Sequence, residues 1–310
     1  MLVQEKILYH QNFTVSILFL ECETMSYQII TDSCCDLPES LRDSLSITVL
    51  PLTVEFQGQV LDDKNDDSLK QLYDYFRAGQ SAKTSAVNPT RWASAMEAVL
   101  DQGEDVLTLA FSSGLSTTYQ SAVIAAEELK ERYPERRMLA IDTLSASMGQ
   151  GLLVYLACQK RDEGMGLEEL AAWVEDTKPH LCHWFTVDDL MYLKRGGRIS
   201  ASAAVMGSVL QIKPVLHMDD DGHLINMLKA RGRKASLRSL AEKLMELGEG
   251  YDNLTVFLSH GDCAEEAAYL ETLLKEQYGV QQVVTGYVGA VIGSHSGPGT
   301  VALFFLGSHR

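Results

Sequence analysis

Short apolar runs alternate with longer amphipathic segments from Met25 onward, and this alternation constrains the fold more than any other feature of the sequence. Residues 27–31 (YQIIT), 104–113 (EDVLTLAFSS) and 137–143 (RMLAIDT) have the composition of buried strands. Between the last two, residues 112–134 place apolar side chains three and four positions apart, as one face of a helix does. Because strands that alternate with helices form parallel βαβ units, the first half is predicted to contain a largely parallel sheet.

The second half of the chain carries a different pattern. Residues 213–231 are predicted to form a β-hairpin that turns at Asp221 and Gly222, a pair typical of two-residue hairpin loops. Further predicted strands occupy residues 181–187, 254–261, 281–289 and 300–307. The predicted fold class is therefore α/β with two domains, residues 25–178 with a largely parallel sheet and residues 179–310 with a mixed sheet.

Residues 1–24 are predicted to be an N-terminal extension outside the fold. Their short apolar patch is flanked by acidic residues, and no clear signal-peptide cleavage site follows it. Met25 directly precedes the first predicted strand, so an upstream start codon would account for the extension.

The chain is acidic, with a formal net charge of −16. That charge opposes binding to nucleic acid or to an anionic membrane surface, and no apolar run approaches the roughly 20 residues of a membrane span. The six cysteines include no Cys-x-x-Cys pair, which is typical of a reduced, cytoplasmic protein. His180, Cys182 and His183 alternate along a predicted strand, and no second ligand pair occurs at metal spacing, so we expect no metal site.

Four segments that follow predicted strands or precede predicted helices are rich in serine and threonine: TDSCCD, KTSAVNP, FSSGLSTT and DTLSASMG. In an open parallel sheet such loops meet at one edge, where ligands bind. Hydroxyls at helix starts often act only as N-caps, but beside free helix N–H groups they also suit an anion. The hydroxyls of interest belong to Thr84, Ser85, Ser112, Ser113 and Ser116.

His295 lies in a further loop-like segment, VIGSHSGPG. It could activate a nucleophile, bind a metal, donate to an anion or pack in a tight loop; the surrounding glycines allow close approach of a ligand and favour the donor role. The sequence lacks a Walker A motif, the third glycine of a dinucleotide fingerprint and a Gly-x-Ser-x-Gly elbow. A hydrolase that uses Ser116 and His295 stays open, although no orienting acid is identifiable.

Eight motifs in order resemble the DegV-like fatty-acid-binding family over nearly the whole chain from Met25. They are DSCCDLP, LPLTVEF, KTSAVNP, SSGLSTTYQSA, DTLSASMGQG, DDLMYLKRGGRIS, the pattern IKPVL…DGHL…KARGRK, and VIGSHSGPGTV. The resemblance implies two α/β domains with one long-chain fatty acid held non-covalently in a buried tunnel between them. Residues 204–212 and 300–306 are candidate tunnel walls, although ordinary core packing also explains them.

The resemblance also implies a role as the substrate-presenting subunit of a fatty acid kinase. The chain itself would then be no enzyme and need no cofactor: a separate ATP-dependent kinase phosphorylates the bound carboxylate for phospholipid synthesis. The carboxylate site would include Thr84, Ser116 and His295, with Ser85 and Ser113 as close alternates. The kinase would dock at Arg198 and at Arg231 or Arg233. A Ser–His acyl hydrolase or acyltransferase is the alternative function, and a regulatory α/β module with a fortuitous cavity is a third.

Overall fold

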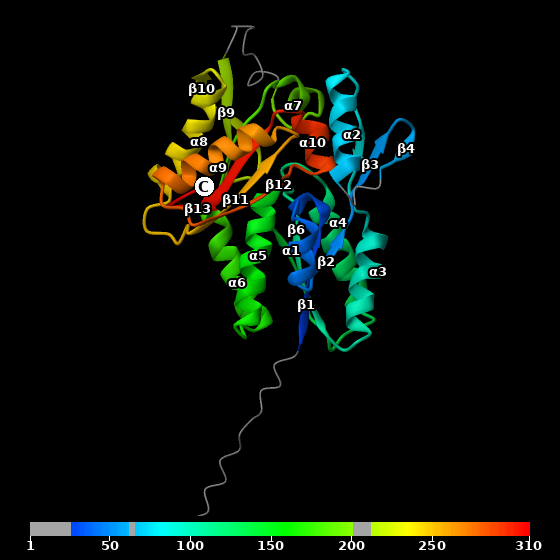
Figure 1. Ribbon diagram of the computed structural model, residues 1–310. Helices are drawn as coiled ribbons and strands as arrows, with labels where there is room; N and C mark the ends of the chain where they lie inside the picture. The colour runs from blue at the N-terminus through cyan, green and yellow to red at the C-terminus, as the bar shows by residue number, and fades with distance from the viewer. Residues whose placement is uncertain (1–25, 62–65, 201–211) are drawn as a thin grey trace, which may run out of the picture.

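The computed structural model describes residues 26–61, 66–200 and 212–310 (Figure 1). The predicted extension at 1–24, and all of the candidate wall 204–212 except Ile212, lie outside the described residues.

The first sheet is four-stranded and entirely parallel, in the order β2-β1-β6-β7. Its strands are β1 (Tyr27–Asp32), β2 (Thr48–Leu50), β6 (Asp105–Ala110) and β7 (Met138–Asp142). Alternate side chains face opposite layers: Ile30 and Val106 pack in one hydrophobic cluster, and Ile29 and Leu107 in another. The first cluster includes α3 (Pro89–Leu100) and α4 (Thr118–Leu129). The parallel sheet predicted from the strand–helix alternation is confirmed.

The second sheet has six strands and a mixed arrangement, in the order β10-β9-β8-β13-β11-β12. Its strands are β8 (Leu181–Thr186), β9 (Ile212–Met218), β10 (Leu224–Arg231), β11 (Thr255–His260), β12 (Gln282–Tyr287) and β13 (Val301–Leu306). Only β11 and β12 pair in parallel. One face packs against α8 (Arg233–Leu247) and α9 (Ala264–Gln277). The two α/β units of the predicted fold class are present, including the hairpin that turns at Gly222, where φ is +74°.

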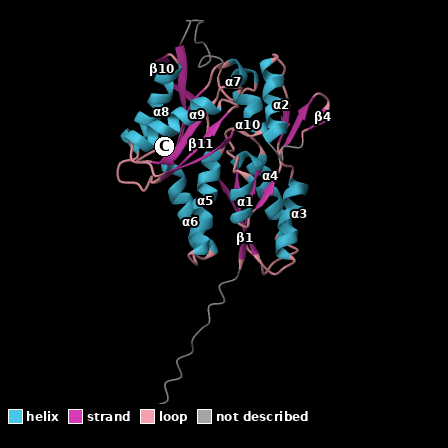
Figure 2. Cartoon of the chain, in the orientation of Figure 1, coloured by secondary structure: helices cyan, strands magenta, loops and turns pink. Residues whose placement is uncertain are grey.

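Helices α5 (Met148–Asp162) and α6 (Leu167–Thr177) join the two sheets (Figures 1 and 2). One hydrophobic cluster combines Ile29 and Leu107 of the first sheet, Leu152 of α5, and Phe257 and Phe304 of the second sheet. The predicted division at 178/179 stays a prediction, because α5 and α6 belong to a core that both sheets share.

A small antiparallel sheet and several short helices complete the structure beside the first sheet and at its carboxyl edge (Figure 2). The small sheet has the order β4-β3-β5, with β3 (Thr53–Phe56), β4 (Gln59–Val60) and β5 (Lys83–Ser85). The remaining helices are η1 (Ser33–Cys35), α1 (Glu39–Ser44), α2 (Asp66–Arg77), η2 (Lys178–His180), α7 (Met191–Arg195) and α10 (Ala290–Ser296). His295 therefore lies on a short helix rather than on the loop that its glycines suggested, and the helix ends at Ser296, directly before Gly297, where φ is +78°.

Candidate functional site

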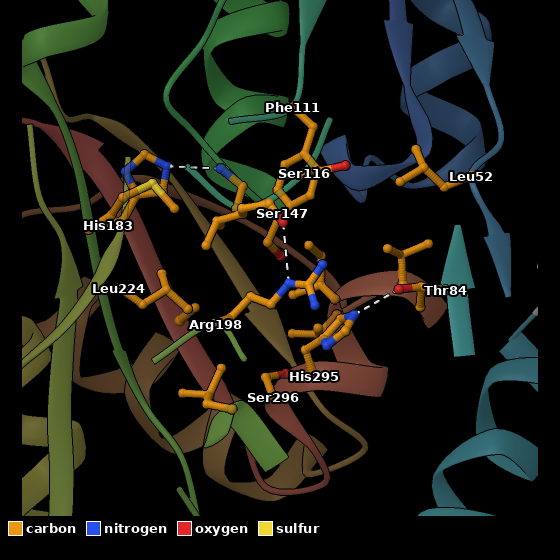
Figure 3. Close-up of a pocket in the computed structure, with 18 of the residues that line it drawn as sticks. Leu52, Thr84, Phe111, Ser116, Ser147, His183, Arg198, Leu224, His295 and Ser296 are labelled. Atoms are coloured by element: carbon orange, nitrogen blue, oxygen red, sulfur yellow. Dashed lines mark hydrogen bonds between the residues drawn. The ribbon is translucent and has the colours of Figure 1, made fainter. Parts of the chain in front are cut away.

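A pocket of about 440 Å³ lies where loops of the first sheet meet β5, α10 and one face of the second sheet (Figure 3). All five hydroxyl and imidazole side chains that the sequence placed in a carboxylate site line it: Thr84, Ser85, Ser113, Ser116 and His295. Arg198 lines it as well. Their predicted role in binding a carboxylate stays a prediction, but the structure does bring them to one cavity.

Thr84 and His295 form one of the hydrogen bonds that link the two halves of the chain at this site. Thr84 lies on β5, opposite Val54 of β3, and His295 comes from α10. The Thr84 Oγ1 and His295 Nε2 atoms are 2.8 Å apart, although the residues are 211 positions apart in the sequence (Figure 3). The pairing fixes the imidazole ring at the polar side of the pocket.

The His295 imidazole is uncharged at neutral pH. Burial, with a smaller contribution from the positive charge of Arg198, lowers the pKa of His295 from 6.5 to about 4. Its Nδ1 atom is buried and has no hydrogen-bond partner among the described residues. A neutral ring carries one N–H, so it can take part in a hydrogen-bond network around an anion without adding a charge.

The two predicted serines of the β6–α4 loop have different surroundings. Ser116 Oγ is 2.9 Å from Thr118 Oγ1 and accepts a hydrogen bond from the Thr118 N–H, so part of its role is to cap the start of α4. Ser113 donates its backbone N–H to the Asp142 carboxylate at 3.1 Å, and its side chain lines the pocket. Ser112, the other hydroxyl singled out, is buried and donates to the Gly222 carbonyl, so its role is structural.

The three arginines predicted to dock a kinase lie in different surroundings. Arg198 is half-buried in the pocket wall, where its Nε donates to the Leu115 carbonyl at 3.2 Å and its Nη1 donates to the Gly196 carbonyl. Arg231 is exposed at the end of β10. Arg233 is half-buried and donates to the Gly299 carbonyl. Arg231 is thus the arginine of this group that is most available to a partner.

Most of the pocket wall is apolar. Alternate residues of β13 face it: Ala302 and Phe304 line the pocket, while Leu303 and Phe305 pack against α8 and α9. The candidate wall at 300–306 therefore lines the pocket with one face and forms core with the other. The other apolar lining residues include Leu52, Phe111, Leu115, Leu193, Met218, Leu224, Val288 and Val291.

His183 lies across the pocket from Thr84 and His295 (Figure 3) and was not identified as a site residue from the sequence. It is fully buried, and its Nδ1 is 3.0 Å from the Leu181 carbonyl. Burial lowers the pKa of His183 well below 6.5, so the ring is neutral. The period of two along β8 was the available signal, because it placed His183 on the same face as Phe185, another lining residue.

Asp32 holds the loop at Phe111 in place through hydrogen bonds, and it was also not identified as a site residue from the sequence. This fully buried carboxylate accepts the N–H of Cys34 at 3.0 Å, the N–H of Phe111 at 2.8 Å and the side-chain amide of Gln150 at 3.3 Å. Burial raises its pKa from 3.8 to about 6 against these hydrogen bonds. Asp32 thereby ties the loop that starts at Phe111 to β1 and α5.

The Ser116–His295 pair that a hydrolase would need is not formed among the described residues. Within the described residues, His295 bonds to Thr84 and Ser116 bonds to Thr118, with no hydrogen bond between Ser116 and His295. The part of the chain with described coordinates also contains no group of three or more His, Cys, Asp or Glu side chains suited to a metal ion. Across residues 26–61, 66–200 and 212–310, no helix is long and apolar enough to cross a membrane.

Comparisons with known proteins agree on one family. The model of the DegV family, described as an uncharacterised protein family, matches residues 26–308. A DegV domain-containing protein of Clostridium perfringens is 46% identical over 286 residues, which are 92% of this chain and 98% of that protein.

Solved structures give the same result. A fatty-acid-binding DegV family protein from Thermus thermophilus superposes with a TM-score of 0.82 at 30% identity, covering 91% of this chain and 100% of that one. DegV of Bacillus subtilis, a fatty-acid-binding protein, superposes with a TM-score of 0.77 at 27% identity, covering 92% and 100%.

Proposed function

This chain belongs to the DegV family, and on that premise we propose that it binds one long-chain fatty acid non-covalently and presents the carboxylate to a separate ATP-dependent kinase. The observation that carries the proposal is the division of the pocket. Hydroxyls and an imidazole gather at one side, and the rest of the wall is apolar.

The apolar wall supplies the affinity. Burying a methylene contributes about 0.8 kcal/mol, so about fifteen methylenes contribute on the order of 12 kcal/mol before entropy costs. The pocket volume of about 440 Å³ falls in the range of roughly 300–1,000 Å³ that is usual for small-ligand sites. Similar proteins of known structure are described as fatty-acid-binding, which supports this ligand class.

The polar side of the pocket supplies partners for the carboxylate, because a buried carboxylate without hydrogen bonds is costly. We assign Thr84, Ser116 and His295 as the contacting groups, with Ser85 and Ser113 as alternates. Arg198 adds a positive charge, and no Asp or Glu is among the described lining residues. The lining itself therefore favours an anion, although the whole chain carries a net charge of −16.

We propose that the chain is a carrier rather than an enzyme and that it uses no cofactor besides the bound lipid. The lack of a hydrogen bond between Ser116 and His295 in the described structure supports this, since a serine nucleophile needs an adjacent base. The partner kinase would transfer the phosphoryl group. Arg231 is the first candidate for its docking site, and Arg198 and Arg233 are further candidates. Charged residues at such a site mainly set the association rate and the specificity.

A cytoplasmic location fits this role, because ATP is supplied there. The described cysteines are all free, as in most reduced compartments: Cys34, Cys35, Cys158, Cys182 and Cys263.

A coupled assay tests the proposal. Palmitate-loaded protein is mixed with ATP and a bacterial fatty acid kinase subunit, and acyl phosphate is trapped as the hydroxamate. We expect hydroxamate only when both proteins are present. Hydroxamate formed by this chain with ATP alone would contradict the carrier role, and no hydroxamate despite bound palmitate would contradict the presentation role.

A further inference from the structure

We propose that Gly196 is a positioning residue for His295: the missing side chain at position 196 makes room for the imidazole that pairs with Thr84. This inference rests on the proposed function, because it concerns how the carboxylate site is held. Gly196 follows the last residue of α7, and His295 lies on α10.

The distances leave no room for a side chain at position 196. A Cβ atom there would lie 2.2 Å from His295 Nδ1, 3.2 Å from Cγ and 3.3 Å from Cε1, whereas ordinary van der Waals contact begins at 3.4 Å. On the other side of the ring, Nε2 is 2.8 Å from Thr84 Oγ1. The imidazole is therefore held between Gly196 and Thr84, and it cannot move away from position 196 without disturbing its hydrogen bond.

Helix α10 cannot retreat as a whole to relieve the contact. A Cβ at Gly293 would lie 2.5 Å from the hydroxyl oxygen of Tyr73, and one at Gly297 would lie 2.5 Å from the ring of Tyr192. Tyr73 is fully buried and donates to the carbonyl of Val288, two residues before the start of α10. Close packing at the middle of the helix and just past its last residue concentrates any strain on the His295 side chain.

The backbone itself does not require glycine at this position. Gly196 has φ −71° and ψ −10°, an ordinary right-handed conformation, whereas the next residue, Gly197, has φ +70°. Alanine at position 196 would thus meet no backbone strain, and the three atoms nearest to its Cβ would all belong to His295. Gly197 has open space around its Cβ position, so its need for glycine comes from the backbone conformation alone.

Gly196 also contacts Arg198, the charged residue of the pocket lining. Its carbonyl accepts a hydrogen bond from Nη1 of Arg198. One residue therefore borders the imidazole through its missing side chain and the guanidinium through its carbonyl, and a shift of this backbone would disturb both.

Gly196→Ala tests the inference, with Gly166→Ala as the matched control. Gly166 also has an ordinary negative φ of −71°, and nothing lies within 4 Å of its Cβ position. Delipidated proteins are titrated with palmitate and with hexadecanol, which has the same chain length but no carboxylate. We expect Gly196→Ala to weaken palmitate binding by about 10- to 100-fold, the usual cost of losing a hydrogen bond to a charged group, and to leave hexadecanol binding unchanged.

A double-mutant cycle separates positioning from general damage. In the His295→Ala background the conflict is gone, so adding Gly196→Ala should cause no further loss of palmitate binding. Wild-type affinity in Gly196→Ala, an equal loss for hexadecanol, or the same fold-loss in both backgrounds would overturn the inference. If Gly196→Ala is too unstable to titrate, His295→Ala should restore its melting temperature, and failure to do so would also overturn it.

The proposed function fails in a different way. Wild-type protein that does not bind palmitate, or His295→Ala that binds it as well as wild type does, would refute the assigned carboxylate site whatever the result at position 196.

Discussion

Asp32 makes the stability of this protein depend on pH in a direction opposite to that of most carboxylates. The group is fully buried, and its pKa is raised from 3.8 to about 6 by the loss of solvent. Between these two values the folded protein binds a proton more strongly than the unfolded chain does. Protonation therefore favours folding, and the contribution of Asp32 to stability falls as the pH rises from about 4 to about 6.

The size of the effect follows from the shift. The rise from 3.8 to about 6 is roughly two pKa units, and each unit corresponds to about 1.4 kcal/mol. Ionised Asp32 thus costs the folded state about 3 kcal/mol at neutral pH. In Asp32→Asn that cost disappears, but one amide oxygen cannot accept the N–H groups of both Cys34 and Phe111, which costs about 1–3 kcal/mol at every pH.

Urea unfolding of wild type and Asp32→Asn at a series of pH values from 3 to 8 measures this directly. The difference between the two free energies of unfolding should change by about 3 kcal/mol across the window, in favour of the variant at high pH. The contributions of all other titrating groups cancel in that difference. Parallel pH profiles would refute the assignment of a raised pKa to Asp32.

Three further predictions concern the pocket and the partner. Thr84→Ala combined with Ser116→Ala should weaken palmitate binding by at least about tenfold, because two hydroxyl donors to the carboxylate are lost. A fluorescence displacement assay would measure the affinity, and an unchanged affinity would contradict the carboxylate assignment. His295 should remain neutral from pH 7 down to about 5, because its pKa is about 4. Its contribution to the stability of the fold falls as the pH falls below 6.5, because the unfolded chain binds the proton first. His295→Gln should remove this loss of stability in the same urea series. Arg231→Glu should slow kinase-dependent hydroxamate formation and leave palmitate binding unchanged, with Lys229→Glu on the same exposed strand as a control; equal effects of the two variants would argue for a general charge effect.

The fold class could be predicted because its signals are local. Ile29 and Ile30 lie in a short apolar run, and the spacing of Ala122, Ala126 and Leu129 marks a helix face; both signals act within a few residues. The hairpin at Gly222 was equally local, since a positive φ at that position selects glycine.

The site was harder to predict from the sequence because it depends on long-range packing. Ser116 and His295 were identified as site residues, but the pairing of His295 with Thr84 depends on how α10 approaches the small sheet. The glycines around His295 suggested a loop, whereas Gly293 and Gly297 allow a short helix to pack against Tyr73 and Tyr192.

The buried charged groups were the hardest to anticipate. In the sequence, Asp32 resembles any acidic residue at the end of a strand, and only the structure shows that it is fully buried. Arg198 was grouped with Arg231 as a docking residue because the family resemblance implies that role for both. Only the structure distinguishes a guanidinium in a pocket wall from an exposed one.

Mass spectrometry of the lipid released from purified, denatured protein tests the central claim most directly. We expect one equivalent of a long-chain fatty acid per chain, extractable without hydrolysis because it is held non-covalently. A protein that is empty as purified and also fails to bind added palmitate would contradict the account, and so would an acyl group that stays covalently attached after denaturation.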